Sequence, residues 1–192
     1  MKNDDLREEV NRAVEVMRKG GVILYPTDTI WGIGCDATNP EAVKKVYDIK
    51  KRDDSKSLIL LLENDGHLQR YVKDIPEVAW DIIDLAEKPT TVIFSGAYNL
   101  APQVIAEDGS VGIRLTKDDF CRQLIRRLSK PLVSTSANIS GEPSPTSFAD
   151  VSQEIKNRVD YVVNHRQEER GHSTPSAIIK VGDGGLVEII RK

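Results

Sequence analysis

Apolar positions along the chain follow two periods, one helical and one strand-like, that alternate. Helical spacing predicts helices near 6–17, 40–50, 76–86, 119–128 and 148–156. Short apolar or alternating runs predict strands near 22–25, 57–62, 91–94, 111–116, 132–134, 161–163, 176–181 and 186–191. The polar segments 26–34 and 134–147 are predicted to be loops.

Strands and helices alternate through most of the chain, and a hairpin across Asp183-Gly184 closes it. This order predicts an α/β (α+β) fold with a large twisted mixed sheet and flanking helices. The length of 192 residues is typical of one domain, so we expect residues 1–192 to form a single domain.

The composition is that of a globular protein, with 39% hydrophobic and 30% charged residues. It excludes a disordered tail, a coiled coil and a membrane span, since the longest apolar run covers only 58–62. The net charge of −3 argues against a general nucleic-acid coat. Cys35 and Cys121 lack a metal-type spacing, and residues 1–20 lack a signal-peptide core, so we expect a cytoplasmic protein.

Polar clusters that follow apolar strands are the candidate chemistry, because ligands bind at strand ends in open α/β sheets. A P-loop motif is absent, and Gly32-Ile33-Gly34 lacks the third glycine of a dinucleotide fingerprint. The cluster Tyr25-Pro26-Thr27-Asp28-Thr29, taken alone, is better explained as a capped turn. The cluster Ser134-Thr135-Ser136-Ala137-Asn138 is suited either to cradle an oxyanion or to form an Asx or Ser/Thr turn.

Lys50 continues the apolar face of its helix, seven residues after Val43, so we expect it to point inward. Lys51 is rotated away from that face. Because a buried ammonium is costly unless it meets an anion, Lys50, Arg52 and Lys56 are candidates to gather phosphate groups. The alternative is a solvated basic helix end.

Arg114 lies inside the alternating strand 111–116, on the face opposite Ile113 and Leu115. An arginine there needs an anionic partner, either a carboxylate of the protein or a carboxylate of a substrate. The serines and threonines have no obvious His or Asp partner, which argues against a nucleophilic triad. Adenylate formation fits better, because phosphate chemistry depends mostly on positioning and charge stabilisation.

Together these motifs resemble those of the YrdC family. The segment from Gly20 to Thr29 resembles the opening motif of that family, and Lys50-x-Arg52 with Ser136-x-Asn138 resembles its K-x-R and S-x-N signature. The likeness runs from Val22 to Arg191. A departure is Asp53, which stands where the family usually has proline and adds negative charge beside the phosphate site.

The resemblance implies a twisted mixed sheet around a concave basic cavity, and the activity of a threonylcarbamoyl-AMP synthase, a nucleotidyltransferase. Such an enzyme makes threonylcarbamoyl-adenylate from L-threonine, bicarbonate or CO2, and ATP, and it releases pyrophosphate. The resemblance also implies Mg²⁺ with the ATP. The implied partners are a transferase that moves the threonylcarbamoyl group onto the tRNA adenosine next to the anticodon, and tRNA or other double-stranded RNA.

The resemblance assigns roles to individual residues, with no metal ligand among them. The catalytic positions are Lys50, Arg52, Ser136 and Asn138. The ATP-contacting positions are Arg52, Lys56, Ser110, Ser136, Ser144 and Arg191. The L-threonine positions are Thr29, Arg114, Ser134 and Ser176, with Arg114 facing the amino-acid carboxylate.

Two other functions stay open on the sequence. The first is a non-catalytic YrdC-like paralogue that binds RNA or nucleotide, and the second is an RNA-binding module. The presence of both the K-x-R and the S-x-N motif favours the enzyme. An aromatic content of 5% and the acidic balance argue against the module, since single-strand binders use basic grooves and stacking platforms.

Overall fold

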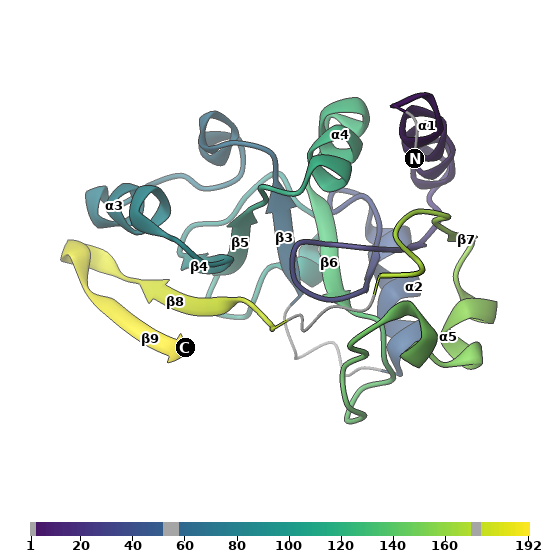
Figure 1. Cartoon of the computed structure of the whole chain (residues 1–192). Helices are drawn as coiled ribbons and strands as arrows, with labels where there is room; N and C mark the ends of the chain where they lie inside the picture. The colour runs from purple at the N-terminus through teal and green to yellow at the C-terminus, as the bar shows by residue number, and fades with distance from the viewer. Residues whose placement is uncertain (1–2, 52–57, 170–173) are drawn as a thin grey trace.

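A mixed sheet of nine strands organises the computed structural model, which describes residues 3–51, 58–169 and 174–192 (Figure 1). The strand order is β7-β1-β2-β6-β3-β5-β4-β8-β9. The pairs β1–β7, β3–β5 and β4–β8 are parallel, and the other neighbours are antiparallel. The predicted fold class, a large mixed sheet with flanking helices, is therefore confirmed.

The elements have the following bounds. The strands are β1 (Ile23–Tyr25), β2 (Gly32–Gly34), β3 (Ile59–Leu62), β4 (Thr90–Phe94), β5 (Val111–Leu115), β6 (Leu132–Ser136), β7 (Tyr161–Val162), β8 (Ala177–Val181) and β9 (Val187–Arg191). The α-helices are α1 (Asn3–Arg18), α2 (Pro40–Lys50), α3 (Glu77–Leu85), α4 (Asp119–Leu128) and α5 (Gln153–Arg158). The 3₁₀ helices are η1 (Asp65–Arg70), η2 (Pro102–Val104), η3 (Phe148–Asp150) and η4 (Asp183–Gly185).

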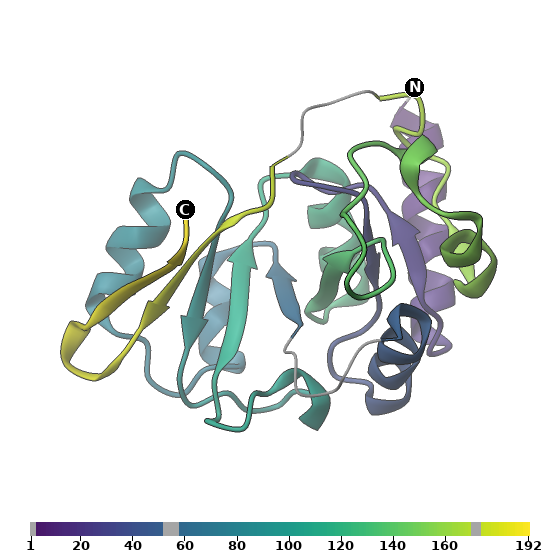
Figure 2. The ribbon, with the colours of Figure 1, turned by 90° about the horizontal axis from the view of Figure 1, so that it is seen from below.

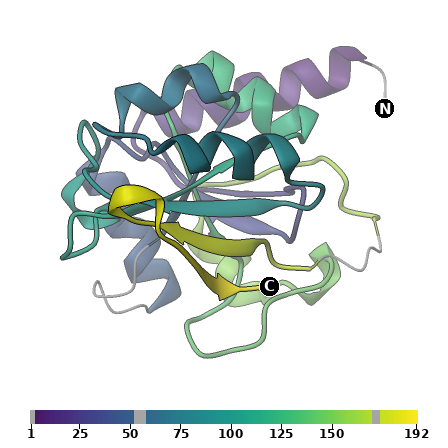
Figure 3. The same ribbon diagram turned by 90° about the vertical axis from the view of Figure 1, so that its left-hand side faces the viewer.

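The central strand β3 is buried on both faces. Leu61 packs in an apolar cluster with residues of α1 and α4, whereas Leu60 and Leu62 belong to a larger cluster with residues of α2 and α3. In Figure 1, α1 and α4 lie at the top of the view, α3 at the left, and α2 and α5 at the lower right. Figure 3 shows the same helices from the side, with α1 and α4 again at the top. Figure 2 shows the β8–β9 hairpin at the opposite end of the molecule from α1.

Side-chain caps fix the helices that lead into the site. The Asn39 side chain accepts the backbone N–H groups of Glu41 and Ala42, both at 3.1 Å, and Pro40 occupies the first turn of α2. Asp118 caps α4 by accepting the N–H of Cys121 at 2.9 Å. Asn39 and Asp118 are both of the residue types preferred at helix N-caps, and the caps fix where α2 and α4 begin.

Two of the predicted boundaries are wrong. The predicted loop 26–34 contains the strand β2, which the sequence hides because two of its three residues are glycines. A Cβ atom on Gly34 would lie 2.3 Å from the carbonyl oxygen of Val133, so only glycine allows β2 to approach this closely. The strand β6 also continues to Ser136, two residues beyond its predicted end at Ser134.

One predicted helix also changes form. The predicted helix 148–156 is divided into η3 and α5.

The described residues include no helix that is long and apolar enough to cross a membrane.

Candidate functional site

A polar cavity of about 240 Å³ lies against β3, β5, β6 and β8, and most of the predicted site residues line it. The charged groups in its described lining are two arginines, and no carboxylate is among them. Residues of two of the polar clusters, 25–29 and 134–138, therefore meet in one place together with Arg114. The predicted site residues in the lining are Thr29, Arg114, Ser134, Ser136, Ser144, Ser176 and Arg191.

The loop between β1 and β2 carries Thr29 into the cavity. The Thr27 hydroxyl donates to the carbonyl oxygen of Ile30 at 2.8 Å and accepts the backbone N–H of Thr29 at 3.0 Å. The hydroxyl oxygens of Thr27 and Thr29 are also 3.0 Å apart. The cluster is thus a side-chain-stabilised turn, and the same turn presents a hydroxyl to the cavity.

Arg114 is buried in the middle of the sheet, with 2% of its surface exposed. Its Nη2 donates to Asp28 Oδ1 at 2.9 Å and to Thr29 Oγ1 at 3.3 Å. Its Nε is buried and has no hydrogen-bond partner among the described residues. Of the two partners that the sequence left open, the structure contains the protein carboxylate, and Asp28 was not among the predicted site residues.

Ser176 and Arg191 form a second side of the cavity. Ser176 is buried, and its Oγ lies 2.9 Å from Oγ1 of Thr91 on β4. Arg191 Nε donates to the carbonyl oxygen of Ser176 at 2.9 Å, so the last residue of β9 reaches across to the start of β8. Thr91 was also missed from the sequence, because its role depends on the parallel pairing of β4 with β8.

Lys50 points inward as predicted, with 1% of its surface exposed. Its Nζ donates to the backbone carbonyl oxygens of Ser136 at 2.5 Å and Asn138 at 2.7 Å. These carbonyl oxygens belong to the end of β6 and the loop after it, and the contact of Lys50 with a phosphate stays a prediction. Lys51 points away, with a half-exposed side chain paired to Glu154 at 2.8 Å.

The remaining predicted residues lie around the cavity or outside the described structure. The Asn138 amide donates to the carbonyl oxygens of Ile139 and Glu142, and so supports the turn without lining the cavity. Ser110 precedes β5 and also lies outside the lining; its backbone N–H donates to Asp108 Oδ1 at 3.0 Å. Arg52, Lys56 and Asp53 lie outside the described residues.

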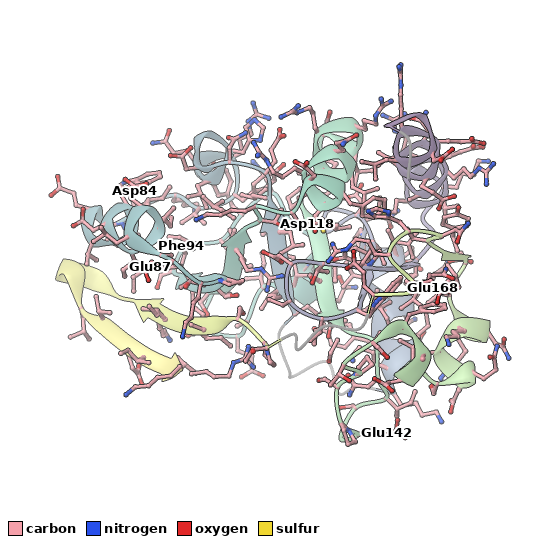
Figure 4. The ribbon with its side chains drawn as sticks, in the orientation of Figure 1. Asp84, Glu87, Phe94, Asp118, Glu142 and Glu168 are labelled. Atoms are coloured by element: carbon pink, nitrogen blue, oxygen red, sulfur yellow. The ribbon has the colours of Figure 1, made fainter. Side chains whose placement is uncertain are left out.

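Burial governs the electrostatics beside the cavity. Burial raises the pKa of Asp28, and the nearby guanidinium of Arg114 opposes that shift. Asp118 lies at the start of α4, near the loop that carries Asp28 (Figure 4), and its carboxylate pairs with Arg166 at 2.6 Å. The two carboxylates are thus each matched by an arginine, and Arg191 contributes positive charge to the cavity itself.

The described lining of the cavity contains no carboxylate that could bind Mg²⁺. Among residues 3–51, 58–169 and 174–192, no cluster of three or more His, Cys, Asp or Glu side chains is arranged to hold a metal. Mg²⁺ prefers oxygen ligands and is usually bound by one or two carboxylates together with substrate phosphates. The described side chains therefore do not form a resident magnesium site.

Comparison with solved structures places the fold. The chain superimposes on P. abyssi Sua5 complexed with L-threonine with a TM-score of 0.80 and 25% identity, covering 90% of this chain and 50% of that one. It matches E. coli YciO with a TM-score of 0.82 and 23% identity, covering 97% and 89% of the two chains. The present chain thus spans about half the length of that Sua5 chain and most of YciO.

Sequence comparison gives the family. The family model for Sua5, YciO and YrdC proteins, described as "Telomere recombination", matches residues 15–192. A curated relative from Pseudoalteromonas translucida, named threonylcarbamoyl-AMP synthase, is 34% identical over 91% of this chain and 94% of its own. The fold and site define an α/β protein with a polar, arginine-lined cavity. The chain belongs to the Sua5/YciO/YrdC family.

Proposed function

We propose that this chain is a threonylcarbamoyl-AMP synthase that condenses L-threonine, bicarbonate or CO2, and ATP. The relatives that carry this name match nearly the whole chain, which favours the enzyme over a non-catalytic paralogue. The Sua5 structure with bound L-threonine supports threonine as the amino acid.

The observation that carries the proposal is the convergence of Thr29, Arg114, Ser134 and Ser176 on one cavity. They come from four separate parts of the chain, yet together they supply one guanidinium and three hydroxyls. A guanidinium is the natural partner of a carboxylate. Hydroxyls can accept from the ammonium group of threonine and can both donate to and accept from its hydroxyl group. The cavity therefore offers partners for every polar group of that amino acid.

In the proposed reaction, the threonine amine attacks the carbon of CO2 derived from bicarbonate. A carbon–nitrogen bond forms, the nitrogen loses a proton, and a carbamate results. A carbamate oxygen then attacks the α-phosphorus of ATP, the bond between the α-phosphorus and the bridging oxygen breaks, and pyrophosphate leaves. The described residues take no covalent part, so they act by positioning and by stabilising charge.

The ATP side of the cavity is proposed to include Ser136, Ser144 and Arg191, with Arg52 and Lys56 contributing from outside the described residues. Lys50 and Asn138 act there by shaping the turn that holds Ser136, since both side chains bond to backbone carbonyls of that turn. Ser110 is proposed as an ATP contact at the edge of this region. Magnesium is proposed to arrive with the triphosphate as part of the ATP substrate.

Pyrophosphate release tests the proposal. The purified protein should release pyrophosphate only when ATP, L-threonine and bicarbonate are all present, and omission of any one should reduce the signal to background. Release that needs ATP alone would contradict the proposal.

The cellular context is part of the same proposal. We propose that residues 1–192 act as one domain in the cytoplasm, and that a partner transferase receives the adenylate for tRNA modification. Direct contact with tRNA is proposed to involve the positively charged cavity.

A further inference from the structure

Asp28 reaches Arg114 from outside the cavity that the substrates would occupy. Its carboxylate lies 2.9 Å from Arg114 Nη2, but Asp28 itself lines a separate cavity whose walls include Phe94 and Ile113. Its side chain is only 16% exposed. The pair therefore links a loop residue behind the site to the buried arginine at its base.

The hydrogen bonds of this pair determine which edge of the guanidinium remains for a ligand. An arginine Nη2 carries two hydrogens, and here one is directed to Asp28 and the other to Thr29. The Nε hydrogen is buried without a partner among the described residues. Because Arg114 also lines the cavity, a carboxylate that enters there can accept from guanidinium hydrogens that Asp28 does not take.

We propose that Asp28 is a positioning residue for substrate carboxylate recognition, because it holds the Arg114 guanidinium in one orientation against the cavity that Arg114 lines. This inference rests on the proposed function. Asp28 also supplies the negative charge that makes a buried guanidinium tolerable before the substrate arrives. Threonine thus meets an arginine whose orientation is already set, which reduces the entropy lost on binding.

Direct binding of L-threonine, measured by calorimetry without ATP, separates this role from a general loss of structure. Asp28→Ala should weaken threonine binding roughly tenfold or more, since removing one partner of a buried pair costs at least about 1.4 kcal/mol. Asp28→Asn keeps an oxygen that can accept from Nη2 and should recover part of the affinity. The KM for ATP should stay within about twofold of the wild-type value in Asp28→Asn, because Asp28 does not face the ATP side.

Glu63→Gln is the matched control. Glu63 lines the same rear cavity, its side chain is 8% exposed, and it pairs with Arg126 at 3.0 Å without touching Arg114. This variant should bind threonine as the wild type does. Unchanged threonine affinity in both Asp28 variants, or an equal loss in Glu63→Gln, would overturn the role of Asp28 alone. If the wild-type protein binds no threonine, the threonine pocket of the proposed function fails as well.

Discussion

The ammonium group of Lys50 donates to the carbonyl oxygen of Asn138 at 2.7 Å, and this bond ties the end of α2 to the turn after β6. Nζ also donates to the carbonyl oxygen of Ser136, and the backbone N–H of Ser140 returns a bond of 2.8 Å to the carbonyl of Lys50. The two signature motifs thus meet in space, although Lys50 and Asn138 are 88 residues apart in sequence. The two motifs act together, because the Lys50 side chain of the first motif holds the turn that carries the second.

Lys50→Ala should therefore reduce both turnover and stability. It removes the ammonium donor from two partly buried carbonyl oxygens; that of Ser136 keeps the N–H of Asn138, and an unsatisfied carbonyl costs about 1–3 kcal/mol. Misplacement of the Ser136 turn should lower the rate of pyrophosphate release on the order of 10²-fold. Lys44→Ala is the control, since Lys44 is exposed on the same helix. Equal activity and equal melting temperature in the two variants would show that Lys50 holds nothing in place.

Thr91→Val removes the hydroxyl that pairs with Ser176 while keeping nearly the same shape. Ser176 Oγ would lose its 2.9 Å partner inside the sheet, so its hydroxyl should no longer have one preferred orientation toward the cavity. We expect the KM for threonine to rise several-fold, with a loss of about 1 kcal/mol in the free energy of unfolding. Steady-state kinetics with threonine varied at saturating ATP measures the first effect. A KM for threonine equal to that of the wild type would show that Thr91 does not contribute to threonine binding.

Amino-acid selection follows from the hydroxyl-rich lining. Valine has the shape of threonine but no hydroxyl, so it would leave buried polar groups unpaired and should be rejected strongly. Serine lacks only a methyl group, which costs about 1–3 kcal/mol, and should be the better substitute. Rates of pyrophosphate release with the three amino acids test this order. Equal turnover of threonine and valine contradicts it.

Asp108 should contribute to acid stability near the predicted ATP residue Ser110. Hydrogen bonds from Ser110, and then from Lys180, lower the pKa of Asp108 to about 2. The charged carboxylate is favoured in the folded state, so its contribution is present above the ordinary value of 3.8 and is lost as the pH falls through about 2. Asp108→Asn should flatten the pH dependence of urea unfolding in that window, by a small amount because the group is exposed.

The neighbouring exposed residue provides the control for this measurement. Glu107→Gln should leave the acid limb of the stability profile as it is in the wild type. A profile that is the same for Asp108→Asn and the wild type would show that the bonds to Ser110 and Lys180 add nothing to stability.

Much of the fold could be predicted from local patterns. Asn39 and Asp118 are strong capping residues in the right places, and the structure uses both as caps. The helical spacing that placed Lys50 inward needed only the apolar face of one helix. The strand β2 could not be predicted, because its Gly-Ile-Gly sequence has no strand preference and is held by the neighbours β1 and β6.

The sequence indicated which residues form the site, but not which hydrogen bonds and ion pairs they make with one another. The position of Arg114 in a strand indicated that an anion must be near, yet nothing local could identify Asp28, which lies 86 residues away in sequence. The inward position of Lys50 followed from its helix, whereas its bonds to the carbonyl oxygens of Ser136 and Asn138 could not be predicted. Thr91 gains its contact with Ser176 only through the pairing of β4 with β8. Contacts of this kind depend on tertiary structure, which a single sequence does not display.

Mass spectrometry of the reaction product tests directly whether the protein makes threonylcarbamoyl-adenylate. The protein is incubated with ATP, L-threonine and ¹³C-labelled bicarbonate. The small molecules are then separated and their masses are measured. We expect a threonylcarbamoyl-adenylate that carries a single heavy carbon and is absent when any substrate is omitted. A threonyl-adenylate without the heavy carbon, or no adenylate at all under conditions where the protein binds threonine, would contradict it.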